Sequence, residues 1–254
     1  MPIVAITAEV GAPRREAAQP VTASAPPAPA RPLEWAPGTR TLLVGGGSSH
    51  DFNRWFNLAD VATLKAAQGL SVNYTERYAD VIPALDTVEV LAWSANQDQK
   101  DPVLRKRLMD FADSGKGLVL IHPGNWYIWG DWPEWNRRFV GGGARSHDKY
   151  GEFEVTVTDP EHPMMRGVPT TFRVSDELYH FAQDPLSSPV HVLAVGKNLA
   201  TGKTYPVVWT TPHPRARIAN ITLGHDGIAH DHPAYKQLLV NTVQWVSAPP
   251  TLPR

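Results

Sequence analysis

Three histidines of this sequence each follow a short apolar run. His50 comes after "TLLVGGGSS", His122 after "LVLI" and His225 after "ITLG". Imidazole gains and loses a proton near neutral pH, and its neutral form is a common ligand of transition metals. These three positions are therefore candidate catalytic residues, and His50 and His225 are also candidate metal ligands.

The segment "VSDELY" adds two neighbouring carboxylates, Asp176 and Glu177, as further catalytic candidates. Successive side chains of an extended segment point to opposite sides, so only one of the two is expected to face a given site. Imidazoles with one carboxylate suit Zn, Mn, Fe or Ni, and they equally suit proton transfer without a metal. No HExxH or comparable spacing decides between these alternatives. A divalent metal ion is the one cofactor that these residues suggest.

Glycine runs precede two His-Asp pairs, in "GGGSSHD" and "GGGARSHD". A phosphate-binding loop needs a Lys-Ser/Thr pair after its glycines, and a dinucleotide fingerprint needs a third glycine where His50 stands. We therefore expect no nucleotide cofactor and interpret the first run as a turn that presents His50. Asp51 is then a supporting residue that also caps the following helix. Arg145 and His147, after the second run, are predicted to bind substrate.

Three tryptophans follow His122 closely in "HPGNWYIWGDW": Trp126, Trp129 and Trp132. Aromatic side chains on loops commonly stack on sugar rings, although tryptophans equally fill the cores of large domains. We expect these three to form a stacking wall for a small-molecule sugar substrate.

Apolar runs and amphipathic segments alternate from about residue 40. Continuous runs typical of buried parallel strands lie at 39–45, 70–75, 87–94 and 117–122. Helical spacing covers 54–68, 101–112 and 233–246. After residue 150 the pattern changes to strands with one polar face, separated by proline-rich turns. The predicted fold class is α/β, with a mostly parallel sheet, helices on both faces and additional strands in the C-terminal half. Ligands of such sheets bind beyond the carboxyl ends of the strands, which is where the three histidines stand.

Composition divides the chain into a leader, one domain and a tail. Residues 1–37 are rich in alanine and proline, so a disordered leader is expected. A single domain follows over 38–248, with a short tail at 249–254. No apolar run approaches the length of a membrane span, and the apolar start is a poor secretory signal. We expect a cytoplasmic protein, while a periplasmic or secreted one stays open if the true N-terminus carries a signal.

Charge and cysteine content exclude several classes of function. The net charge of −1 gives no field that recruits nucleic acid or a membrane, so neither is an expected partner. The absence of cysteine excludes disulfides, thiolate metal sites and cysteine nucleophiles. A homo-oligomer is compatible with the sequence.

The motifs resemble those of the ThuA-like family, which is associated with trehalose utilisation. The matching segments run in order over roughly 40–247 and include "VGGGSSHDF", "FVGGGARSH", "HPMMRGV", "DELY" and "LGHD". The resemblance implies a three-layer, flavodoxin-like sandwich of the class I glutamine amidotransferase-like type. It also implies a role in sugar catabolism, on a disaccharide or keto-sugar of the trehalose or 3-keto-glycoside type. Amidotransferase chemistry is not expected, because the chain has no cysteine nucleophile.

Two classes of function follow from these features. The first is an enzyme that acts on a sugar derivative by His/carboxylate acid–base chemistry, with or without a metal, as an isomerase, a lyase or a hydrolase. The second is a non-catalytic carbohydrate-binding or scaffolding domain. The first requires the imidazoles of residues 50, 122 and 225 to lie within the width of one pocket, whereas the second does not.

Overall fold

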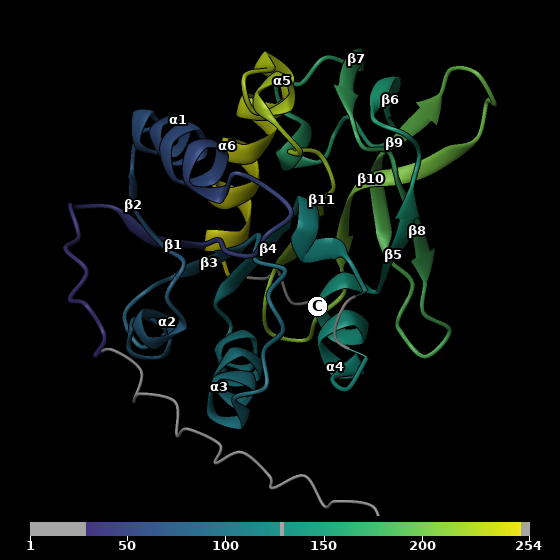
Figure 1. Ribbon diagram of the computed structural model, residues 1–254. Coiled ribbons are helices and arrows are strands. Elements are labelled where there is room, and N and C mark those ends of the chain that lie inside the picture. Colours follow the sequence, from purple (N-terminus) through teal and green to yellow (C-terminus); the bar gives the residue numbers. More distant parts are fainter. Residues whose placement is uncertain (1–28, 128–129, 250–254) are drawn as a thin grey trace, which may run out of the picture.

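A computed structural model describes residues 29–127 and 130–249 of the chain (Figure 1). Five strands form the parallel part of a nine-stranded sheet, in the order β2-β1-β3-β4-β11. With β11 in the fifth place this is the flavodoxin-like order 2-1-3-4-5. The bounds are β1 Thr39–Val44, β2 Leu70–Thr75, β3 Val90–Trp93, β4 Gly117–Ile121 and β11 Ile218–Ile221.

Antiparallel strands extend the sheet beyond β11 in the order β10-β9-β6-β7. They are β10 Thr204–Thr211, β9 His191–Asn198, β6 Gly151–Val157 and β7 Thr171–Asp176. A separate two-stranded ribbon pairs β5 (Gly142–His147) with β8 (Tyr179–Gln183). The predicted mixed sheet, parallel first and extended by C-terminal strands, is confirmed.

Helices cover both faces of the parallel strands, as Figure 1 shows for α1 and α6 on one face and α2 and α3 on the other. The α-helices are α1 Val61–Ala66, α2 Tyr78–Ala84, α3 Pro102–Asp113, α4 Pro133–Trp135, α5 Gly227–His230 and α6 Pro233–Ser247. Two π-helices, with wider turns than an α-helix, are η1 Asn53–Asp60 and η3 Asn136–Val140. Two 3-10 helices, with tighter turns, are η2 His122–Asn125 and η4 Pro163–Met165.

Alternate residues of the central strands face two separate cores. On β1, Leu43 packs in the core that contains α1 and α6, whereas Leu42 and Val44 pack in the core that contains α2 and α3. A strand buried on both faces has no polar face, which explains the continuous apolar runs in the sequence. Because β1, β3, β4 and β11 are parallel, their carboxyl ends lie at one edge of the sheet.

The last part of the predicted leader contacts the domain. Residues 29–37 have no regular structure before β1, yet Arg31 pairs with the buried carboxylate of Asp80 at 3.0 Å, and Trp35 packs against the α2/α3 core. Residues 1–28 of that leader and 250–254 of the predicted tail lie outside the described residues. None of the described helices combines the length and the apolar character needed to cross a bilayer.

Candidate functional site

The glycine turn after β1 brings His50 to the carboxyl edge of the sheet. Gly46 and Gly47 have φ angles of 123° and 138°, which residues with a side chain rarely adopt. A Cβ atom at Gly47 would overlap Asn96 Oδ1, so this turn packs closely against the loop that follows β3. Ser49 Oγ accepts a hydrogen bond from Asn96 Nδ2 at 2.6 Å and lies 2.6 Å from His50 Nδ1. These contacts fix the orientation of the His50 ring.

His122 occupies the sharp turn between β4 and η2. Its φ of 42° makes it the one non-glycine residue with a positive φ in the described part of the chain. Such a conformation is strained and is often retained where a side chain must be held for function. The buried ring donates a hydrogen bond from Nδ1 to Thr222 O at 2.6 Å, because a carbonyl oxygen can only accept. Its Nε2 therefore keeps a lone pair, which accepts from the Tyr179 hydroxyl at 3.2 Å.

Asp176 and Glu177 point to opposite sides, as extended neighbours must. The fully buried carboxylate of Asp176 accepts hydrogen bonds from the backbone N–H groups of Gly224 at 2.7 Å, His225 at 3.2 Å and Glu177 at 2.7 Å. Burial raises the pKa of Asp176 to about 7, although these hydrogen bonds act in the opposite direction. Asp176 therefore holds the main chain of two site residues, and Glu177 supplies the carboxylate that faces them.

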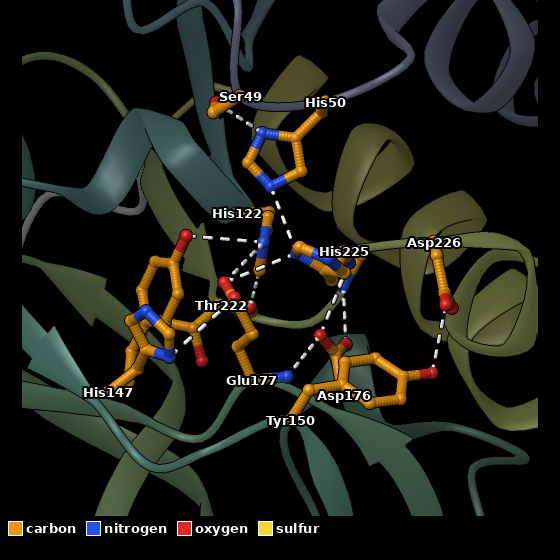
Figure 2. A network of polar contacts seen from close by, with 12 residues as sticks. Ser49, His50, His122, His147, Tyr150, Asp176, Glu177, Thr222, His225 and Asp226 are labelled. Atoms are coloured by element: carbon orange, nitrogen blue, oxygen red, sulfur yellow. Dashed lines mark hydrogen bonds and ion pairs between the residues drawn. The ribbon is translucent and has the colours of Figure 1, made fainter.

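Four side chains from four separate segments converge (Figure 2). Glu177 Oε2 lies 3.2 Å from His225 Nδ1 and 3.7 Å from His122 Nε2, and His50 Nε2 lies 3.2 Å from His225 Nδ1. One nitrogen or oxygen atom of each residue lies within 4.8 Å of those of the other three. The ring centroids of His50 and His122 are 4.8 Å apart, and those of His122 and His225 are 5.5 Å apart. The three imidazoles thus lie within the width of one pocket.

Burial and hydrogen bonding set the protonation states of this cluster. Burial, with help from His225, lowers the pKa of His50 to about 4, and burial lowers the pKa of His122 well below its ordinary value. The hydrogen bond with Glu177 raises the pKa of His225. Burial acts to raise the pKa of Glu177, but the hydrogen bond and the charges of the neighbouring histidines outweigh it and lower that pKa. Near pH 7 His50 and His122 are neutral and Glu177 is ionised.

The cluster opens into a cavity of about 240 Å³ at the carboxyl edge of the sheet. Pro123, Trp126 and Tyr179 give it an apolar and aromatic wall, and His147 lies near Glu177, with 3.6 Å between Nδ1 and Oε1. The cavity is lined by Ser49, His50, Asn96, Pro123, Trp126, His147, Glu177, Tyr179 and His225. It therefore combines polar, titratable groups with flat surfaces on which a sugar ring can stack.

The predicted tryptophan wall is reduced to Trp126 within the described residues. Trp132 is only 7% exposed and packs in the α2/α3 core, with its ring centroid 5.4 Å from that of Trp135. A sugar ring needs an open aromatic face, which Trp132 does not offer to the cavity. Trp129 lies outside the described residues.

The remaining predicted residues lie around the cavity in different ways. His147 lines it and donates a hydrogen bond from Nδ1 to Asp148 O at 2.7 Å. The Arg145 guanidinium lies 4.0 Å from the centre of the Tyr127 ring and is not among the residues that line the cavity. Asp51 Oδ1 accepts a hydrogen bond from Arg54 N at 3.0 Å, as a residue that caps the start of η1 does.

Four residues that line the cavity are not among those predicted from the sequence, namely Ser49, Asn96, Pro123 and Tyr179. Two of them carried a signal. Tyr179 stands two residues after Glu177 and so lies on the same side of an extended segment. Asn96 follows the carboxyl end of β3, so the rule that selected the histidines applies to it as well. Ser49 offered no such signal, because serine is common in turns.

The sequence profile of the ThuA family, described as trehalose utilisation, matches residues 42–246. The chain belongs to the ThuA family. The matched range includes the four residues of the cluster and all strands except the first residues of β1. No curated protein matches this ThuA chain significantly.

Solved structures share the ThuA fold at low sequence identity. A ThuA-like protein from Parabacteroides merdae superimposes with a TM-score of 0.72 at 20% identity, over 83% of this chain and 90% of that one. A ThuA-like protein from Bacteroides uniformis gives 0.70 at 19%, over 85% and 95%. A cytoplasmic protein from Salmonella typhimurium gives 0.57 at 14%, over 81% and 98%. At these identities the likeness shows a shared fold.

Proposed function

We propose that this ThuA protein is an enzyme of sugar catabolism that acts on a keto-sugar, or on a disaccharide that carries a keto group, by proton transfer. The observation that carries the proposal is the convergence of His50, His122, His225 and Glu177 at one cavity. Burying several imidazoles beside a carboxylate costs free energy unless the groups are fully paired. Such clusters of titratable groups are therefore found preferentially at functional sites. A domain that only binds carbohydrate needs an aromatic wall such as Trp126 but no such cluster.

The reaction starts with removal of a proton from the carbon next to the carbonyl. It needs a base for that proton and groups that stabilise the negative charge that develops on the carbonyl oxygen. Glu177 suits the role of the base. Its Oε1 lies near His147, whereas its Oε2 lies near His122 and His225. His50, His225 and Tyr179 suit the second role, because all three line the same cavity.

Two outcomes of this step balance in atoms. When the proton returns to the former carbonyl carbon, and the hydroxyl proton of the neighbouring carbon is transferred to the former carbonyl oxygen, the keto group moves by one carbon, which is an isomerisation. When the deprotonated carbon is bonded to a carbon with a glycosidic oxygen, that oxygen leaves as an alcohol and a double bond forms, which is an elimination. Both use the same base and the same stabilisation of the oxygen.

The experiment is a screen of oxidised and unoxidised disaccharides by mass spectrometry, with and without added divalent metal ions. We expect an isomer or an elimination product from an oxidised sugar, and we expect Glu177→Gln to lower turnover by about 10²–10⁴-fold, which is typical for loss of a general acid or base. His191→Ala is the matched control, because His191 is exposed and pairs with Asp159 outside the cavity lining. Full turnover in Glu177→Gln would contradict the proposal.

A further inference from the structure

We propose that His50, His122, His225 and Glu177 bind one divalent transition-metal ion, through Nε2, Nε2, Nδ1 and Oε2 respectively. The ion binds at the base of the cavity and leaves coordination positions on the cavity side for a substrate oxygen. Its role in turnover rests on the proposed function, whereas its binding does not.

The spacing of the four ligand atoms suits a single ion. In a site with ligand distances of about 2.0–2.1 Å, neighbouring ligand atoms lie about 3 Å apart. Glu177 Oε2 and His50 Nε2 each lie 3.2 Å from His225 Nδ1, and Glu177 Oε2 lies 3.7 Å from His122 Nε2. A single proton on His225 Nδ1 cannot make full hydrogen bonds to both of its neighbours. A cation at the centre satisfies all four atoms at once.

Two of the rings are oriented by a contact of their other nitrogen, Nδ1. Metal-bound histidines usually donate their other N–H group to a carbonyl or another oxygen, which fixes the tautomer and the ring orientation. His122 donates from Nδ1 to Thr222 O at 2.6 Å, and His50 Nδ1 lies 2.6 Å from Ser49 Oγ. Each ring thereby directs Nε2 to the cluster. The positive φ of His122 shows that the backbone, too, is held in an uncommon conformation that aims this ring.

Hydrogen bonds hold the main chain of the other two ligands, His225 and Glu177. The buried carboxylate of Asp176 accepts hydrogen bonds from the N–H groups of both His225 and Glu177. Gly224 is fixed from two sides, because its N–H donates to Asp176 and its C=O lies 3.0 Å from His230 Nε2. The main chain that presents His225 is therefore preorganised without any ion. Such preorganisation is what a metal site requires of its surrounding residues.

The donor set indicates the class of ion. Three imidazoles and one carboxylate suit Zn²⁺, Mn²⁺, Fe²⁺ or Ni²⁺, whereas Mg²⁺ and Ca²⁺ prefer all-oxygen sites. His50, Glu177 and His225 line an open cavity, and the buried His122 ring packs against the rings of His50 and His225. An open position is the mark of a catalytic metal site, in contrast to a closed structural one.

The experiment uses the full chain after treatment with a chelator and dialysis. Calorimetric titration with ZnCl₂, MnCl₂ and NiCl₂, with MgCl₂ as the hard-cation comparison, gives the stoichiometry and affinity, and elemental analysis gives the bound ion. We expect one Zn²⁺, Mn²⁺ or Ni²⁺ per chain and no comparable binding of Mg²⁺. His225→Ala and Glu177→Gln are expected to abolish this binding, and Ser49→Ala to weaken it about 10–100-fold through the orientation of His50. His191→Ala should bind as the unaltered protein does.

Each outcome has a distinct meaning. Absence of stoichiometric binding for all three ions, or unchanged affinity in folded Glu177→Gln, overturns the metal site. Glu177→Gln serves as the second variant in case His225→Ala does not fold, and circular dichroism checks both. Turnover of a keto-sugar by chelator-treated, metal-free protein overturns the role of the ion in turnover and keeps the proposed function, while the titration decides whether the ion binds. Metal binding without turnover on any oxidised sugar supports the inference and contradicts the proposed function.

Discussion

The carboxylates of Asp176 and Glu177 are adjacent in the chain but lie on opposite sides of the backbone. Glu177 faces the three histidines of the cavity, while Asp176 accepts hydrogen bonds from the main chain that carries His225 and Glu177 itself. Glu177 places a carboxylate in the site, and Asp176 holds the main chain that positions His225 and Glu177. The two substitutions should therefore have different consequences.

Asp176→Asn should destabilise the protein. An asparagine at this position turns an N–H group towards the N–H of Gly224, which now donates to Asp176 Oδ2 at 2.7 Å. Loss of a buried hydrogen bond and an unpaired donor cost about 1–3 kcal/mol. Urea unfolding measures this cost, with Asp51→Asn as the matched control at an exposed position. An unfolding free energy equal to that of the unaltered protein would show that Asp176 does not hold these segments.

His230→Gln should destabilise the protein more at low pH than at high pH. His230 is buried, with Nδ1 2.6 Å from Asp60 Oδ1 and with Tyr235 donating to the other oxygen of Asp60. Burial acts to lower the pKa of His230, but the charge and hydrogen bond of Asp60 outweigh it, with Asp176 adding to the effect, so the pKa is raised.

The raised pKa of His230 sets the sign of the pH dependence. Because the folded pKa is raised, the stabilisation is fully present below the unfolded value of about 6.5. It is lost as the pH rises through the folded pKa. Breaking a buried ion pair costs about 3–5 kcal/mol, so we expect a loss of that order at pH 6 and a smaller one at pH 9. Urea unfolding of both proteins at the two pH values measures the difference, and a loss that does not change with pH would contradict the pairing.

His122→Gly should be more stable than His122→Ala. The φ of 42° at this position is costly for alanine and costs glycine nothing. We expect a difference of about 1 kcal/mol, because a residue with a Cβ at a positive φ is destabilising. Thermal unfolding of the two variants tests this without any assay of activity. Equal midpoints, or a higher midpoint for the alanine variant, would show that the turn after β4 relaxes when the imidazole is removed.

The positions of the site histidines could be predicted from the sequence because one rule connects them. Parallel strands end at the same edge of a sheet, so residues 50, 122 and 225, though far apart in the chain, meet at that edge. The same rule extends to Asn96, which follows the carboxyl end of β3. The fold class could be predicted for a related reason, since strands buried on both faces leave continuous apolar runs.

Other features depend on contacts that spacing does not encode. Alternation along an extended segment predicts that Asp176 and Glu177 face opposite sides, but it does not say which of them faces the cavity. A tryptophan near a turn suits both a rim and a core, and Trp132 belongs to the core because α3 and α4 pack around it. Arg31 and Trp35 lie in a proline-rich segment that offers little to bury, yet Asp80 and the α2/α3 core provide partners for them.

Deuterium exchange tests the central claim, that this cluster removes a proton next to a sugar carbonyl. The protein is incubated in D₂O with an oxidised disaccharide, and mass spectrometry measures deuterium in the recovered sugar and in any product. We predict incorporation at one carbon, at a rate that falls about 10²–10⁴-fold in Glu177→Gln and is unchanged in His191→Ala. Incorporation at the same rate in Glu177→Gln, or none above the rate without protein for every keto-sugar tried, would contradict the account.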